Sequence, residues 1–103
     1  MSEAITKLEE VPPGQSKRVT VEGQEVALFN VEGTLYALGN RCAHRSGPLV
    51  KGKIETVEET LAVRCPIHGW LFELATGRCL TRPSAGVPSF PVLCENGEVR
   101  LGR

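Results

Sequence analysis

Short apolar runs separated by tight turns dominate this chain of 103 residues. Three of the turns carry a glycine at their second position, and they are Glu22-Gly23, Glu32-Gly33 and Asn96-Gly97. Glycine readily adopts the positive φ that a two-residue hairpin turn needs, and the Val, Ile and Thr of the flanking runs favour strands. The pattern therefore predicts β-hairpins and an all-β fold, with no amphipathic helix.

Ten strands are expected from the runs between turns. They cover residues 5–8, 17–21, 25–31, 34–38, 55–57, 60–64, 71–74, 78–80, 91–94 and 98–101. The run at 25–31 is apolar on both faces, which is typical of a strand buried on both sides. Residues 40–54 and 65–70 show no periodicity and are expected to be irregular loops. Residues 82–91 contain three prolines and cannot form a central strand.

Composition excludes several classes of protein. The chain has 12 Lys and Arg against 12 Glu, and only five aromatic residues, which makes nucleic-acid binding a poor interpretation. No apolar run approaches the roughly 18 residues of a membrane span. Residues 1–10 lack the apolar segment of a secretion signal, so we expect a cytoplasmic protein with reduced cysteines.

The two histidines of the chain each lie close to a cysteine, as Cys42-Ala43-His44 and Cys65-Pro66-Ile67-His68. Both pairs fall in the expected irregular loops, which can fold around a metal as a regular strand cannot. Two Cys and two His could hold a structural zinc, although zinc fingers usually pair Cys with Cys and His with His. The alternating order fits better a two-iron cluster with both Cys on one iron and both His on the other.

The two loops resemble the ligand loops of Rieske [2Fe–2S] proteins. The first continues as C-x-H-x4-L-x2-G through Leu49 and Gly52, and the second as C-P-x-H-G-x2-F-x3-T-G through Phe72, Thr76 and Gly77. The resemblance implies one [2Fe–2S] cluster per chain with Cys42, His44, Cys65 and His68 as its ligands. The short chain is similar to the Rieske-type ferredoxins of bacterial aromatic-ring dioxygenase systems.

That resemblance implies a single domain in which a small cluster-binding subdomain, about residues 40–83, is inserted into an antiparallel β-sandwich base of residues 1–39 and 84–103. It implies an electron carrier without an active site of its own, passing one electron from a flavin-dependent reductase to an oxygenase. A monomer is expected. Two alternatives stay open, namely a Rieske-like small subunit of a larger redox enzyme such as nitrite reductase, and a zinc-stabilised binding module.

Departures from the family pattern indicate a low reduction potential. High-potential Rieske proteins carry a disulfide between their ligand loops, but Gly47 and Ile67 stand at the matching positions here. Their hydroxyl donors after the second loop are replaced by Trp70 and Phe72. Fewer hydrogen bonds to sulfur leave the reduced state less stabilised, so we expect a potential of about −150 mV.

The remaining candidate residues have weaker signals. Cys79 and Cys94 lie in strand-like runs and are expected to be buried free cysteines. Trp70 and residues 83–91 are expected to shield the cluster from water. The basic residues of the first loop region could form a docking face for an acidic partner, and they are Arg41, Arg45, Lys51 and Lys53.

Overall fold

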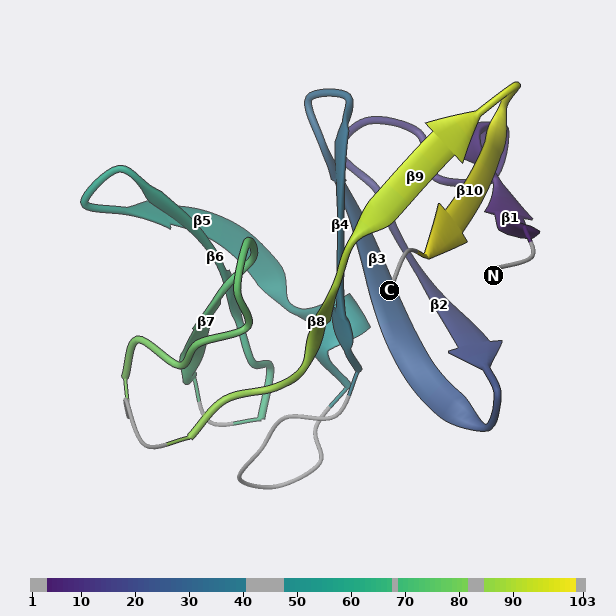
Figure 1. Ribbon diagram of the computed structural model, residues 1–103. Coiled ribbons are helices and arrows are strands. Elements are labelled where there is room, and N and C mark those ends of the chain that lie inside the picture. The colour runs from purple at the N-terminus through teal and green to yellow at the C-terminus, as the bar shows by residue number, and fades with distance from the viewer. Residues whose placement is uncertain (1–3, 41–47, 68, 82–84, 102–103) are drawn as a thin grey trace.

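The computed structural model describes residues 4–40, 48–67, 69–81 and 85–101. In these ranges the chain forms ten strands and two short 3₁₀ helices (Figure 1). They are, in order, β1 (Ala4–Lys7), η1 (Leu8–Glu10), β2 (Ser16–Val21), β3 (Gln24–Val31), β4 (Thr34–Gly39), η2 (Leu49–Lys51), β5 (Lys53–Val57), β6 (Thr60–Arg64), β7 (Leu71–Glu73), β8 (Ser89–Phe90), β9 (Val92–Glu95) and β10 (Glu98–Leu101). No helix in these ranges is long and apolar enough to cross a membrane.

Two-residue turns join the strands where the sequence predicts them. In the hairpins β2–β3, β3–β4 and β9–β10 both turn residues have positive φ, for example 53° at Asn96 and 77° at Gly97. This is the type I′ geometry, whose twist matches that of the flanking strands. The β5–β6 hairpin has the same pattern of φ without a glycine, at Glu58 (50°) and Glu59 (69°).

The strands form three antiparallel sheets. One has the order β1-β10-β9, the second β2-β3-β4-β8 and the third β5-β6-β7. The first sheet pairs the two ends of the chain, since Thr6 lies opposite Val99. In Figure 1 the hairpin β3–β4 stands between the β9–β10 hairpin on one side and β5–β7 on the other.

Strand β3 is buried on both faces, which confirms the prediction from its apolar run. Val26 and Leu28 belong to one hydrophobic cluster, whose other buried members include Val99 and Leu101 of β10. Ala27 and Phe29 belong to the other cluster. Successive side chains of a strand point to opposite faces, so the β2-β3-β4-β8 sheet separates two cores.

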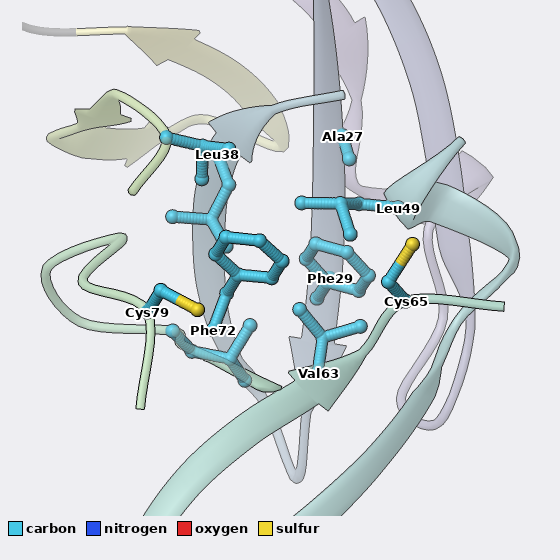
Figure 2. Packing of buried hydrophobic residues seen from close by; sticks show 10 residues of the cluster. Ala27, Phe29, Leu38, Leu49, Val63, Cys65, Phe72 and Cys79 are labelled. Atoms are coloured by element: carbon cyan, nitrogen blue, oxygen red, sulfur yellow. The ribbon is translucent and has the colours of Figure 1, made fainter. Parts of the chain in front are cut away.

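The second cluster joins this middle sheet to the β5-β6-β7 sheet and contains Cys65. Figure 2 shows Phe29 of β3 and Phe72 of β7 in this cluster, with Leu49 and Val63 beside Cys65. Phe29, Phe72 and Leu49 are almost fully buried. The cysteine that the sequence identifies as a ligand is thus also part of the packed interior.

Residues 40–54 are more ordered than the sequence predicts. Within the described part of this segment, backbone hydrogen bonds from Lys51 to Pro48 and from Gly52 to Leu49 form η2. Strand β5 then starts at Lys53, which pairs with Arg64. The expectation of a loop up to residue 54 was wrong, because this pairing depends on a strand further along the chain.

The strand expected at residues 78–80 is reduced to single bridges. Cys79 bridges to Phe72 and Arg78 to Gly86, while β7 ends at Glu73. Among the described residues of the proline-rich segment, 85–91, only Ser89 and Phe90 form a strand, β8, at the edge of the middle sheet. This agrees with the prediction that the segment cannot supply a central strand.

Candidate metal centre

Cys65 is the predicted ligand that the structure describes, whereas Cys42, His44 and His68 lie outside the described residues. Cys65 directly follows β6, and its residue is 1% exposed. Its thiol is free of disulfide bonding. A buried, free cysteine at the end of a strand can serve as a fixed metal ligand.

Hydrogen bonds close a tight turn directly after Cys65. The Cys65 backbone N donates to the carbonyl oxygen of Trp70 at 2.7 Å, and the Gly69 N donates to the Cys65 oxygen at 3.0 Å. Gly69 has a φ of 79°, which an L residue rarely adopts and glycine tolerates. Burial changes sharply within this turn, because Ile67, two residues from the buried cysteine, is 57% exposed.

Arg64 ties the turn to the neighbouring strand. Its Nη1 donates to the Gly69 carbonyl oxygen at 3.1 Å, while Nε and Nη2 donate to the two carboxylate oxygens of Glu55 on β5. The hydrogen bond from Arg64 lowers the pKa of the Glu55 carboxyl, and the hydrogen bond with Glu55 raises the pKa of Arg64. The sequence predicts a strand over residues 55–57 but gives no sign of this contact, since it connects residues of two strands.

The ends of the first predicted ligand loop meet at Asn40. Its carbonyl oxygen accepts a hydrogen bond from the Leu49 N at 2.7 Å, and its side-chain oxygen accepts one from the Val50 N at 2.8 Å. Asn40 is 1% exposed. The sequence analysis did not single out this residue, although a polar residue between a strand and a Cys-x-His pair was a possible signal.

The other motif residues have packing roles. Leu49 and Phe72 are fully buried in the Cys65 cluster. A Cβ added to Gly52 would lie 2.3 Å from the carbonyl oxygen of Arg64, and one on Gly77 would lie 2.0 Å from that of Val87. Both positions therefore require glycine, and Gly52 brings η2 against the strand end that precedes Cys65.

Thr76 has a local role in the turn between β7 and Gly77. Its hydroxyl donates to the Glu73 carboxylate at 2.6 Å and accepts a hydrogen bond from the Arg78 N at 3.2 Å. The Gly77 N donates to the Glu73 carbonyl oxygen at 2.7 Å. The turn after the second ligand loop is therefore held by side-chain and backbone contacts together.

The predicted shielding residues are described in part. Trp70 is half-buried and packs against the Cys65 cluster. Val87 is buried in the same cluster, and its N donates to the Gly77 carbonyl oxygen at 2.9 Å. Residues 82–84 lie outside the described residues, so shielding of a cluster by this segment stays a prediction.

Of the other cysteines, Cys79 is buried as predicted, and neither it nor Cys94 is in a disulfide, but the prediction that Cys94 is buried was wrong. Cys94 is exposed, because β9 is the edge strand of its sheet and the core there is filled from β10. Among the described residues no three His, Cys or Glu side chains gather as a metal site. The described part of the chain therefore offers no competing metal site.

Lys51 and Lys53, two of the four residues of the predicted basic face, are exposed. Arg41 and Arg45 lie outside the described residues. The docking role of this face stays a prediction.

Comparison with known proteins identifies the family. The profile of the Rieske-like [2Fe-2S] domain matches residues 3–102. The ferredoxin component of a naphthalene 1,2-dioxygenase system from Pseudomonas aeruginosa is 38% identical over 95 residues, covering 91% of this chain and 88% of that protein. The ferredoxin subunit of 3-phenylpropionate/cinnamic acid dioxygenase from Escherichia coli K12 is 34% identical over 91 residues, covering 87% and 82%.

A solved structure of similar length agrees with the observed fold. It is assigned as the small subunit of an NADH-dependent nitrite reductase from Mycobacterium tuberculosis, and it superimposes with a TM-score of 0.92 at 25% identity. The superposition covers 100% of this chain and 95% of that one. The all-β fold with its three antiparallel sheets is thus the Rieske-type fold that the ligand motifs implied. On these grounds the chain belongs to the family of Rieske-like [2Fe-2S] domains, which hold one [2Fe–2S] cluster each.

Proposed function

We propose that this protein is a one-electron carrier that takes an electron from a flavin-dependent reductase and delivers it to an oxygenase. The observation that carries the proposal is the 38% identity, over most of both chains, to a ferredoxin component of a dioxygenase system. The carrier has no catalytic residues of its own in this proposal. It works as a cytoplasmic monomer, and its base (1–39 and 84–103) supports the cluster-binding subdomain (40–83).

Cys42, His44, Cys65 and His68 would hold the cluster in this proposal. The free and buried Cys65 fits a thiolate ligand, because the charge of a buried thiolate is favourable only beside a cation. Two imidazoles in place of two thiolates leave the centre less negative, so that it accepts an electron more readily than a four-Cys centre. The group supplies reversible one-electron chemistry when bound.

The burial gradient of the second loop supports a carrier of this kind. Cys65 is buried in the core, while Pro66 and Ile67 next to it are exposed. His68, a predicted ligand, follows Ile67 in the sequence, and in this proposal the partner approaches at this exposed part of the turn. Electron-transfer encounters are weak and small, which allows the carrier to leave again.

A second candidate function is that of a small subunit held within a larger redox enzyme. It is favoured by the TM-score of 0.92 to the structure assigned as a nitrite reductase small subunit. Stopped-flow mixing and size-exclusion chromatography together separate the two functions. Rapid reoxidation of the reduced protein by a ring-hydroxylating terminal oxygenase supports the carrier, whereas stable co-elution with a nitrite reductase large subunit supports the alternative.

Visible absorption and EPR spectra test the cluster itself. The purified protein should be red-brown and, after dithionite reduction, give a rhombic EPR signal with an average g value below that of four-Cys ferredoxins. Its potential should lie at about −150 mV. A potential above zero would contradict the argument from the missing hydroxyl donors. A colourless protein with stoichiometric zinc would leave only the zinc-stabilised module.

Ligand exchange tests the assignment of the histidines. His44→Cys and His68→Cys each add one negative charge at the centre, so we expect both to lower the midpoint potential in protein-film voltammetry. Cys79→Ser is the matched control, because Cys79 is a buried cysteine that forms no disulfide and lies outside the predicted ligand set. A histidine variant whose potential equals that of the parent would remove that histidine from the ligand set.

A further inference from the structure

Asn40 occupies a position where the chain leaves the middle sheet for the first predicted ligand loop. It follows β4 directly and is 1% exposed. Its backbone N donates to the Glu25 carbonyl oxygen at 3.0 Å, and its Nδ2 donates to the Glu25 carboxylate at 3.2 Å. These two bonds anchor Asn40 to the start of β3, the strand that is buried on both faces.

The acceptor atoms of Asn40 bind the far end of the loop. The backbone carbonyl accepts from Leu49 and the side-chain Oδ1 accepts from Val50, at 2.7 and 2.8 Å. One buried residue thus ties together positions 40, 49 and 50, and the segment between them includes Cys42 and His44. An amide is the side chain suited to this place, since it donates to a carboxylate and accepts from a backbone N–H at once.

The hydrogen bonds from Leu49 and Val50 to Asn40, called the Asn40 clamp below, also connect to the second ligand loop through η2. Leu49 packs in the same core cluster as Cys65, and Gly52 lies against the carbonyl oxygen of Arg64, the residue before Cys65. From β2, the Ser16 hydroxyl donates to the Val50 carbonyl oxygen at 2.8 Å. The position of η2 therefore links the end of the first loop to the start of the second.

We propose that Asn40 is a positioning residue that closes the first ligand loop and fixes it relative to Cys65. This inference rests on the proposed function, because it takes Cys42 and His44 as ligands. Asn40 does not touch the metal centre in this account. It acts by holding the backbone from which two of the four ligands come, in the way that groups around a metal site orient its ligands.

The chain offers a matched control in Asn30. This residue is 4% exposed, and its side chain also makes one donated and one accepted hydrogen bond. It donates to the Val11 carbonyl oxygen at 2.7 Å, where Asn40 donates to a carboxylate, and accepts from the Gly33 backbone N at 2.8 Å. Asn30 lies five residues from Glu25 along β3, about 17 Å away at the opposite end of the hairpin. Asn30→Ala and Asn40→Ala therefore remove equivalent hydrogen bonds at the two ends of one hairpin.

The test compares both variants as holoproteins. Each should have a lower urea midpoint than the parent, because each leaves at least one buried or part-buried backbone group without its side-chain partner. Only Asn40→Ala should bleach about tenfold faster when EDTA is added, and only its EPR signal should change in rhombicity. Equal bleaching rates and unchanged EPR signals in the two variants would overturn the proposal.

A second variant covers the case in which Asn40→Ala does not fold. Glu25→Ala keeps Asn40 and removes the carboxylate that accepts from its Nδ2. We expect bleaching about threefold faster than in Glu22→Ala, its control in the exposed turn. Equal rates would overturn the proposal. If the parent contains zinc, the proposed function fails, and the same variants are compared by zinc transfer to a chromogenic chelator, where equal rates would overturn the Asn40 clamp as well.

Discussion

Cys65 combines two requirements at the scale of a single residue. Its side chain fills space between the middle sheet and the β5-β6-β7 sheet, and the sequence assigns the same sulfur to a metal. Serine would leave a buried hydroxyl, and alanine a cavity, so either substitution affects both the core and the ligand set. Under the predicted ligand set, the packed core would itself hold one ligand of the metal centre in place.

Glu10 is a second residue whose surroundings set its chemistry. Its carboxylate accepts hydrogen bonds from Lys17 Nζ at 2.6 Å and from the Thr6 hydroxyl at 2.5 Å. The hydrogen bond from Lys17 is the largest of the effects that lower the pKa of Glu10 from 4.5 to about 2. Because this pKa is depressed, the stabilisation is present above pH 4.5 and is lost as the pH falls toward 2.

We expect Lys17→Met to return the pKa of Glu10 toward 4.5. In a ¹³C NMR titration the parent carboxylate should remain ionised at about pH 3.5, whereas in the variant it should be largely protonated at that pH. Arg18→Met is the control, since adjacent strand residues point to opposite faces. If the two variants titrate Glu10 alike, general surface charge and not the Lys17 contact lowers the pKa.

The β5–β6 hairpin is strained at the scale of an element. Glu58 and Glu59 both adopt positive φ, which other two-residue turns of this chain give to a glycine at the second position. Replacing them by Asn-Gly should stabilise the holoprotein by about 1 kcal/mol and raise its thermal midpoint by about 4–8 °C. Glu22→Asn is the control, because that turn already has its glycine; an equal gain there would contradict the strain argument.

The same hairpins show which strands can be predicted from the sequence. Glycine turns and β-branched apolar runs are local signals, so the bounds of β2, β3, β4 and β10 were predicted to within 1 residue. The short strand β8, the start of β5 and the exposure of Cys94 depend on pairing with distant strands, and sequence reasoning missed them.

For the candidate site, the His and Cys spacing is a local signal and predicts the ligands, of which Cys65 is described. The hydrogen bonds of Asn40 and Arg64 join residues that are distant in the chain, so they cannot be predicted from a single sequence.

At the scale of the whole molecule, we expect the two outer sheets, each of three strands, to depend unequally on the metal centre. The β1-β10-β9 sheet and the β5-β6-β7 sheet pack on opposite faces of the middle sheet, in separate hydrophobic clusters. Only the cluster under β5-β6-β7 contains a predicted ligand, Cys65. Loss of the metal centre should therefore destabilise the β5-β6-β7 sheet more than the β1-β10-β9 sheet.

Hydrogen exchange measures this difference with an internal control. In the holoprotein we expect the slowest amides in β3, which has a strand on each side and a core on each face. After the cluster is removed with acid and chelator and the protein is returned to neutral pH, protection in β6 and β7 should fall at least about tenfold more than in β10. A uniform fall would show that the two cores unfold as one unit, and that Cys65 ligation stabilises the whole molecule equally.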